Sequence, residues 1–447
     1  MEDISRFVSK TLDNIGYSAE LIKERRERWQ ERNRINQKLH GTHIVSSFVV
    51  GSKAEGITFP FENDIDEISL SSNIICTNNV EAFSTRSRTM LFYTDATNTS
   101  PGYTKLKLIK GKRHGDRLIN ESLFRQRSAI FACSSLYASA HHRSMLRVLG
   151  PSRVFKDLSG PAVTHTFGVW KSDCVFGVHC IHTDILLFFR TRPRQHDWPP
   201  ISILQDDSSI LCQLVPVGCK GSCNQWMEWR FCFLGTELTL TKSFNDTQIK
   251  IYVLLKFVAK DILKCVSNEI SSYIMKNITY WVSELLDSRV FQEQNLMLLL
   301  LIGLKFLKEA IDSNRLPYYM ITGRNLIFER LNIHTRRRLS HLLSYLLQEG
   351  PQFLLRCNKL RIGLLAMHMV PITLKHFGNK RELLESLFLL SFNVFILERH
   401  GCRVGNVRKQ LWQKMFNIVL PEWKQLQRRT GNDIFWILND RIVRVLS

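Results

Sequence analysis

Asp64 and Asp66 stand one residue apart in a segment that begins with Gly51 and Ser52. Side chains alternate across a strand, so the two carboxylates would point to the same face. Neighbouring carboxylates repel each other unless a cation lies between them. Oxygen ligands of this kind suit Mg²⁺ or Mn²⁺, which also bind phosphate oxygens. The pair therefore predicts a metal site that handles phosphate groups.

The residues before the acidic pair favour the same chemistry. The apolar run 44–50 indicates a strand that leads directly into Gly51 and Ser52. Backbone N–H groups in such a turn could bind phosphate oxygens. Asp-x-Asp and Gly-Ser sequences are also common in ordinary turns, so each alone is weak evidence. Strand, turn and acids in this order predict a nucleotidyltransferase site.

Two further acids are candidates for a third metal ligand. Asp184 opens the run 184–188, whose apolar residues are typical of a buried strand. Asp173 opens the segment 173–180, in which every second residue has the character of a core residue. The pattern does not decide which of the two aspartates is the third metal ligand.

The composition sets the class of protein and of partner. The chain has 447 residues, 44% of them hydrophobic, which predicts a folded protein of two or three domains. Its formal charge of +21 and pI near 9.7 predict a polyanionic partner. Contributors to a basic surface are Lys105, Lys107, Lys110, Lys112 and Arg113, or Arg336, Arg337 and Arg338.

The cysteines and the N-terminus indicate a compartment. The N-terminus lacks the apolar core of a signal peptide, and the longest apolar run, 296–304, is too short to span a bilayer. Eleven cysteines without a secretory signal indicate free thiols in a reducing compartment. No Cys-x-x-Cys pair occurs, which disfavours a zinc site. The cytoplasm is expected, with the nucleus as the alternative.

Residues 3–38 follow a helical pattern in which basic residues and glutamates are interleaved. The set comprises Lys23, Arg25, Arg26, Arg28, Arg32 and Arg34 with Glu24, Glu27 and Glu31. Such a mixture predicts a solvated helix face with ion pairs one turn apart.

The remaining patterns define an α+β fold. Strand and turn signals fill residues 44–113, a helix is predicted over 117–150, and another strand region follows residue 160. From residue 246 the apolar spacing becomes helical and stays so to the C-terminus. The predicted domains are a mixed-sheet core with an N-terminal helix at 1–245, a helical lobe at 246–347 and an additional helical segment of unknown role at 348–447.

Several motifs together resemble the cyclic GMP-AMP synthase-like receptors and the related male-abnormal-twenty-one (Mab) proteins. The resemblance covers residues 43–345. The motifs are Gly51-Ser-Lys-Ala-Glu-Gly56, Asp64-Ile-Asp66, Gly160-Pro161, Asp184-Ile-Leu-Leu187, Trp198-Pro199, Trp229-Arg230, Leu255-Lys256 and Ser271-Ser-Tyr-Ile-Met-Lys276, with Thr97–Tyr103 as a weaker match.

The resemblance implies a bilobal fold: a nucleotidyltransferase sheet lobe, a helical lobe and an active site between them. It also implies a Mg²⁺- or Mn²⁺-dependent enzyme that joins ATP and GTP into a cyclic dinucleotide. Asp64, Asp66 and Asp184 would bind the metals. The nucleotide-binding set it implies has Gly51 and Ser52 at the triphosphate, Lys256 and Ser272 at phosphate, Tyr273 stacked on a base, Arg230 facing the acceptor nucleotide and Lys276 nearby.

Departures from the family pattern shape the expected biology. Glu67 adds a negative charge beside the proposed metals, and the chain between residues 160 and 184 is longer than in the family. The zinc insertion of the vertebrate DNA sensor, expected after residues 229–233, has no counterpart here. The resemblance therefore implies innate immune sensing of double-stranded RNA or another polyanion, rather than a zinc-dependent grip on DNA.

Other functions and simpler structural roles stay open. The chain could be an inactive family member that acts as a nucleotide-binding scaffold or developmental regulator, or an enzyme that extends an RNA 3′ end. A dimer is a further partner to consider. Arg230 could pair with Glu228 or Glu237, and Asp184 with Arg190 or Arg192.

Overall fold

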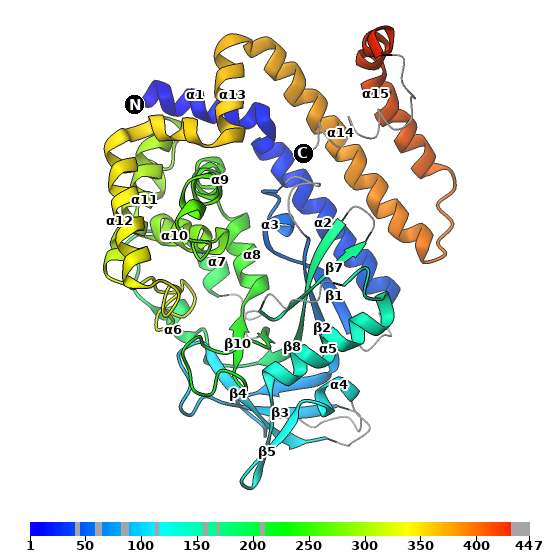
Figure 1. Ribbon diagram of the computed structural model, residues 1–447, viewed down its shortest axis with the longest axis vertical. Helices are drawn as coiled ribbons and strands as arrows, with labels where there is room; N and C mark the ends of the chain where they lie inside the picture. Colours follow the sequence, from blue (N-terminus) through cyan, green and yellow to red (C-terminus); the bar gives the residue numbers. More distant parts are fainter. Residues whose placement is uncertain are drawn as a thin grey trace. The chain divides into compact units, whose positions relative to one another are not determined.

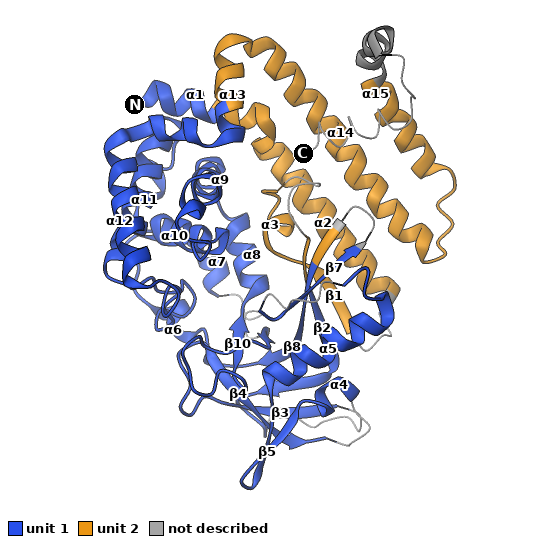
Figure 2. Ribbon diagram, viewed as in Figure 1, with its two compact units in different colours: residues 1–9, 68–166, 173–361 blue, residues 10–67, 167–172, 362–447 orange. Residues whose placement is uncertain are grey.

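The computed structural model describes residues 1–40, 45–58, 65–81, 89–111, 116–154, 160–167, 170–205 and 211–430. The chain forms two compact units (Figure 2). Unit 1 comprises residues 1–9, 68–166 and 173–361, and unit 2 comprises residues 10–67, 167–172 and 362–447. Strands fill much of the first half of the chain and helices the second half, which confirms the α+β prediction.

A mixed sheet is the scaffold of unit 1 (Figure 1). Its strands run in the order β2-β3-β4-β10-β9-β8-β7. β2 and β3 are parallel, whereas β3–β4, β4–β10, β10–β9 and β9–β8 are antiparallel. Their bounds are β2 Ile65–Thr77, β3 Met90–Asp95, β4 Tyr103–Lys110, β7 Ala162–Phe167, β8 Trp170–Ile181, β9 Leu211–Val215 and β10 Trp229–Cys232, and β2 and β8 each begin in unit 2.

The helix predicted over 117–150 is wrong in its middle part. Only α4 (Arg117–Asn120) and α5 (Ser134–Leu149) are helical there. Between them β5 (Leu123–Gln126) and β6 (Ala129–Ala132) form a hairpin, and β6 pairs with β4. The turn places Arg127 at a positive φ of 54°, which a continuous helix does not allow. Pairing with a distant strand therefore overrides the local helical pattern.

Helices complete unit 1, and from residue 246 onward they follow the helical spacing of the apolar residues. Asn245 caps α9 in a reciprocal capping box with Gln248, which explains the start near residue 246. The apolar run 296–304 lies in α11 and is mostly buried. The helices are α1 (Glu2–Leu12, of which residues 2–9 belong to unit 1), α6 (Leu187–Thr191), α7 (Ile201–Leu204), α8 (Leu234–Lys242), α9 (Asp246–Asp261), α10 (Ser272–Leu285), α11 (Leu296–Asp312) and α12 (Ile333–Glu349), with short 3₁₀ turns at Leu263–Cys265, Ser288–Val290, Glu293–Asn295 and Gly350–Arg356.

Unit 2 joins residues from both ends of the chain around one core. Trp29, Val49, Ile65 and Leu389 are buried against one another, with Phe392 packed beside them. The elements are a π-helical turn at Asp13–Tyr17, α2 (Ala19–His40), β1 (Val45–Val49), α3 (Gly51–Ala54), the first residues of β2, the end of α13 (Asn358–Met369), α14 (Pro371–Arg399) and α15 (Val407–Thr430). The segment 348–447 thus supplies part of a core rather than a separate appendage.

The helical pattern predicted over 3–38 is confirmed as two helices, α1 and α2, joined by a turn in which Gly16 has a φ of 98°, but the fully solvated face is not confirmed. Ion pairs one turn apart do form, as between Arg28 and Glu24 at 2.8 Å. Arg25 instead is buried and holds Glu385 with two hydrogen bonds, Nε–Oε1 at 2.5 Å and Nη2–Oε2 at 2.9 Å. Arg32 is also buried. The prediction failed at these positions because their carboxylate partners lie far away in the sequence.

The eleven cysteines are free thiols, as the sequence predicts. Within the described ranges, we find no helix with the length and apolar character that a membrane span requires.

Candidate functional site

Unit 2 places the Gly51 turn directly against Asp66. Gly51 has a φ of +63°, and a Cβ added there would come within 2.6 Å of the Asp66 Oδ2. The Val50 N–H donates to the Asp66 carbonyl at 2.9 Å, which fixes the strand β2 beside the turn. Ser52 follows in α3 and is half-buried, whereas Asp66 is exposed. Asp64 lies outside the described residues.

Glu67 does not add an uncompensated charge beside Asp66. Its Oε1 accepts a hydrogen bond from Arg32 Nη2 at 2.8 Å. Its Oε2 accepts one from the Ser172 hydroxyl at 3.1 Å. Successive side chains of a strand alternate between faces, so Glu67 and Asp66 point in opposite directions. The negative charge of Glu67 is therefore balanced by its ion pair with Arg32 within unit 2.

Asp184 does not open a strand, so that part of the prediction is wrong. It lies in the turn between β8 and α6, where it is exposed. Its Oδ2 accepts a hydrogen bond from Asn78 Nδ2 at 3.2 Å. The apolar run after it buries Leu186 and Phe189 and exposes the two residues between them. That spacing of three fits a helical turn and not a strand.

The strand in this region is β8, and it carries Asp173. The Asp173 Oδ1 accepts a hydrogen bond from the Thr164 hydroxyl of β7 at 2.6 Å. Ser172, the residue before it, belongs to unit 2 and also donates to the Ile65 carbonyl at 3.3 Å. Among the described residues, no three His, Cys, Asp or Glu side chains gather into a metal-binding group.

A buried carboxylate, Glu237 of α8, binds Tyr273 and Lys276, which were predicted to bind nucleotide, and also Tyr318. Tyr273 and Tyr318 donate their hydroxyls to its Oε1 at 2.9 and 2.6 Å. Lys276 Nζ binds its Oε2 at 2.6 Å and lies 5.1 Å from the Tyr273 ring centre. Burial would raise the pKa of Glu237, but Lys276 and the two hydroxyls outweigh it, so this pKa lies below its ordinary value. Glu237 is therefore charged and fixes these side chains.

Arg230 lines a pocket of about 410 Å³ in unit 1. The residue lies in β10 and pairs with Tyr103 of β4 and Val215 of β9. Neither Glu228 nor Glu237 forms an ion pair with it among the described residues; Glu228 instead binds the Ser222 hydroxyl and the Cys219 N–H.

A second guanidinium, that of Arg324, lines the same pocket. Arg324 is 6% exposed and lies between two rings, with its Cζ 5.5 Å from the centre of Tyr103 and 5.0 Å from that of Tyr318. In the chain as described, it forms no ion pair with a carboxylate. A buried charge without a counterion is costly, so an anionic ligand would be bound favourably here.

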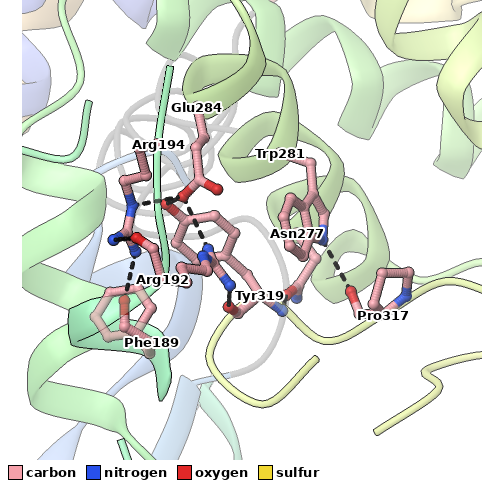
Figure 3. Close-up of polar contacts among 8 residues, drawn as sticks. All are labelled: Phe189, Arg192, Arg194, Asn277, Trp281, Glu284, Pro317 and Tyr319. Carbon is pink, nitrogen blue, oxygen red and sulfur yellow. Dashed lines mark hydrogen bonds and ion pairs between the residues drawn. The ribbon is translucent and has the colours of Figure 1, made fainter. Parts of the chain in front are cut away.

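A network around Glu284 holds α10 in place (Figure 3). Glu284 Oε2 accepts hydrogen bonds from Arg192 at 2.8 Å, Arg194 at 2.9 Å and the Tyr319 hydroxyl at 2.6 Å. Asn277 Oδ1 accepts the Tyr319 N–H at 3.1 Å. Arg192 is thus engaged by Glu284 and not by Asp184. The network fixes the helix that carries Tyr273 and Lys276 against the segment that carries Tyr318.

The other predicted phosphate contacts lie on the helices of unit 1. Lys256 is half-buried in α9, with its Nζ 5.8 Å from the ring centre of Tyr252. Ser272 is exposed and is the first residue of α10.

The residues proposed for a basic surface are divided between exposed and engaged positions. Lys107 and Lys110 of β4 are exposed, as are Arg337 and Arg338 of α12. Lys105 is half-buried and pairs with Asp95 at 3.6 Å, and Arg336 is half-buried. Lys112 and Arg113 lie outside the described residues.

Sequence reasoning missed Tyr318 and Arg324 and recognised Glu237 only as a partner for Arg230. The signal for Glu237 is that it is the one acid among residues 229–244, where a buried carboxylate would need a cation. Tyr318 and Arg324 lie in an irregular segment after α11, and only the fold brings them to β4 and α8.

The comparison with protein families adds independent support. Residues 246–345 match the family described as the Mab-21 protein HhH/H2TH-like domain. No curated protein matches the chain. The matched segment comprises α9 to α12, including Lys256, Ser272, Tyr273 and Lys276. The chain therefore carries, at residues 246–345, a segment similar to the HhH/H2TH-like domain of Mab-21 proteins, which supports its resemblance to the Mab-21 and cyclic GMP-AMP synthase-like family.

Proposed function

We propose that this protein is a metal-dependent nucleotidyltransferase that joins ATP and GTP into a cyclic or linear dinucleotide. The observation that carries the proposal is the close approach of the Gly51 backbone to the Asp66 carboxylate in unit 2. Only glycine leaves room for that carboxylate next to the turn, and the resemblance to the Mab-21 family gives the arrangement a known chemical context.

The residues of unit 2 fit a metal and a triphosphate. Asp66 is an exposed carboxylate, and Asp64, two residues earlier in the sequence, would supply the second one. Mg²⁺ or Mn²⁺ bound there would activate the attacking hydroxyl and stabilise the pyrophosphate leaving group. Ser52 would donate its hydroxyl to a triphosphate oxygen. The charge of Glu67 is balanced by Arg32, so it does not compete for this role.

For the third carboxylate we favour Asp173 over Asp184. Asp173 lies within a strand that pairs with β2, and rigid strands hold metal ligands better than turns do. Asp184 lies in an exposed turn and is bonded to Asn78. The two aspartates are distinguished by Asp173→Asn and Asp184→Asn: the metal ligand should cost at least about a hundredfold in rate, and the other should cost little.

The nucleotides would be bound by residues of unit 1. Lys256 and Ser272 would contact phosphate, Tyr273 would stack on a base, and Lys276 would hold Glu237 and Tyr273 in position. Arg230 would bind the acceptor nucleotide in the pocket that it shares with Arg324. The support for this assignment is the set of three guanidinium groups that line the pocket, those of Arg230, Arg324 and Arg330, of which Arg330 pairs with Glu269.

We further propose that a polyanion such as double-stranded RNA activates the enzyme in the cytoplasm during innate immune sensing. The support is the net charge of +21 together with the exposed residues Lys107, Lys110, Arg337 and Arg338. Binding through phosphate contacts releases counterions, so activation should weaken steeply as salt rises. Activation that is insensitive to salt would argue against an RNA activator.

The test is incubation of the full chain with ATP, GTP, Mg²⁺ or Mn²⁺ and a panel of nucleic acids, followed by chromatography of the products. We expect a dinucleotide that requires metal and disappears in Asp66→Ala. Glu67→Gln is the matched control, since Glu67 lies next to Asp66 but points to the other face, and it should keep activity while losing some stability.

The second candidate function is a nucleotide-binding scaffold without turnover. The observation that favours it is the complete engagement of Glu237 with Lys276, Tyr273 and Tyr318, which builds a rigid site without any metal. A thermal-shift assay would detect nucleotide binding. Binding without any product in the incubation test would support the scaffold function and exclude nucleotidyltransferase activity.

A further inference from the structure

The corner between α13 and α14 exposes a continuous set of apolar side chains. Ile362 is 66% exposed, Leu365 51%, Met369 74% and Ile372 74%, and Val370 between the helices is also exposed. Ile362, Leu365 and Met369 are spaced by three and four residues, so they lie on one face of α13. An apolar face of this kind marks an interaction surface.

On its other side, the corner packs against another segment of unit 2. A Cβ at Gly363 would lie 2.8 Å from the Ile15 Cγ2, and one at Gly378 would lie 2.8 Å from the Asn14 carbonyl oxygen. The two glycines therefore allow α13 and α14 to approach the segment around residue 15 closely. Leu364, next to Gly363, is buried. The exposed apolar face is therefore held in place by the packing on the other side of the corner.

The stretch of chain that forms this face contains basic residues and no acids. No Asp or Glu occurs between Glu349 and Glu382. Arg356 and Arg381 pair with Glu349 and Glu385, and the other basic residues of the stretch are Lys359, Arg361, Lys375 and Lys380. Two histidines, His368 and His376, lie in the same stretch and are exposed, as is Lys375. Apolar side chains next to basic ones are the combination by which amphipathic helices bind anionic lipid surfaces.

We propose that the α13–α14 corner is a membrane-docking surface for anionic lipids. Met369, Val370 and Ile372 would enter the boundary between headgroups and acyl chains, and Lys375 would bind lipid phosphates. A nucleic acid would use the basic residues but would leave the exposed Ile, Leu and Met in water, so lipid is the better fit. The proposal is independent of nucleotidyl transfer and holds equally for an inactive family member.

The experiment is sedimentation of the full chain with vesicles of phosphatidylcholine alone and of phosphatidylcholine with phosphatidylserine. We expect binding to the anionic vesicles and weaker binding to the neutral ones. Met369→Asp/Ile372→Asp should weaken binding to anionic vesicles at least about tenfold, and Lys375→Glu should weaken it about tenfold. Both variants change exposed residues, and melting temperatures would verify that they fold.

Val148→Asp is the matched control. Val148 is 76% exposed near the end of α5 and lies outside the acid-free stretch, so this variant should bind vesicles like the wild type. If the double variant unfolds, Lys375→Glu alone decides. Absence of binding to anionic vesicles, or equal loss in Val148→Asp, would overturn the proposal. So would a result in which the corner variants lose double-stranded RNA binding while vesicle binding is unchanged.

Discussion

Glu237 shows how one side chain organises the residues of unit 1 that we propose bind nucleotide. Its carboxylate is buried and is held by Lys276 at 2.6 Å. Glu237→Gln removes the negative charge that neutralises the buried Lys276 ammonium, so we expect a loss of about 3 kcal/mol in the free energy of unfolding. Urea denaturation of the wild type and the variant measures it.

The control for Glu237→Gln is the double variant Glu237→Gln/Lys276→Met, in which both charges are absent. It should recover most of the lost stability, because a buried pair replaced as a whole costs much less than a broken one. A double variant as unstable as the sum of the single changes would show that Lys276 and Glu237 act separately.

His141 of α5 provides a second test at this scale, through pH. The imidazole is buried, stacked on the Phe176 ring with 4.0 Å between the ring centres, and edge-on to the Tyr137 ring. Burial lowers the pKa of His141 from 6.5 to about 4. The unfolded chain therefore takes up this proton at a higher pH than the folded chain does. Stability should fall as the pH drops from about 6.5 to about 4, by up to ~3 kcal/mol.

His141→Phe should reduce this acid sensitivity, since the ring can still pack on Phe176 and has no proton to take up. The measurement is the free energy of unfolding at pH 7 and pH 5 for both proteins. An unchanged slope between these pH values would mean that other groups carry the acid sensitivity.

The sequence identified residue types well where chemistry depends on neighbours along the chain. Gly51 and Asp66 could be paired from sequence because they lie only 15 positions apart (66 − 51), and the structure brings them together. The cluster around Lys276 could not be found, since Glu237 and Tyr318 lie 39 and 42 positions away from it (276 − 237 and 318 − 276) and meet only in the folded protein. Long-range polar contacts leave little trace in a local pattern.

At the scale of elements, the contact between α2 and α14 includes a buried ion pair beside its apolar core. Arg25 and Glu385 both have fully buried side chains, and Arg381 lies 3.9 Å from the same carboxylate. Arg25→Ala should cost about 3 kcal/mol or more in stability, because the Glu385 charge would lose its main partner in the interior. Arg28→Ala is the matched control, one turn further along α2.

Arg28 pairs with Glu24 at 2.8 Å, but its side chain is 33% exposed. An ion pair that water can reach contributes at most about 1 kcal/mol, so Arg28→Ala should have a small effect. Equal losses in the two variants, measured by thermal or urea unfolding, would mean that burial of the Arg25 pair has no special weight.

Element types were predicted best where the pattern is long. The helices at 3–38 and beyond 246 follow from sustained helical spacing, and Asn245 marks the start of α9. The hairpin 123–132 and the helical turn at 187–191 were missed because each has only a few residues. Over so short a stretch, apolar residues fit a helix or a strand equally well, and pairing with β4 decides the hairpin.

At the scale of the whole molecule, the chain is not divided into consecutive domains. Unit 2 is built from residues 10–67, 167–172 and 362–447, so its core joins the N-terminal and C-terminal parts. Apolar periodicity along the sequence cannot show such a pairing, because each helix has an apolar face whatever its partner. The segment 348–447 therefore carries no recognisable motif and yet supplies Leu389 to the core.

This arrangement predicts that a chain ending at residue 361 will lose the fold of unit 2, although it retains the whole matched domain at 246–345. Without α14, the indole of Trp29 and the guanidinium of Arg25 on α2 would lose the side chains that bury them. Hydrogen exchange should show loss of protection in α2, while α9 to α12 remain protected because their core lies within unit 1. Leu389→Ser, at a position 2% exposed, should weaken the protection of α2, and Leu383→Ser, at a position 52% exposed on the same helix, should not. Full protection of α2 in the shortened chain would show that unit 2 is stable without α14.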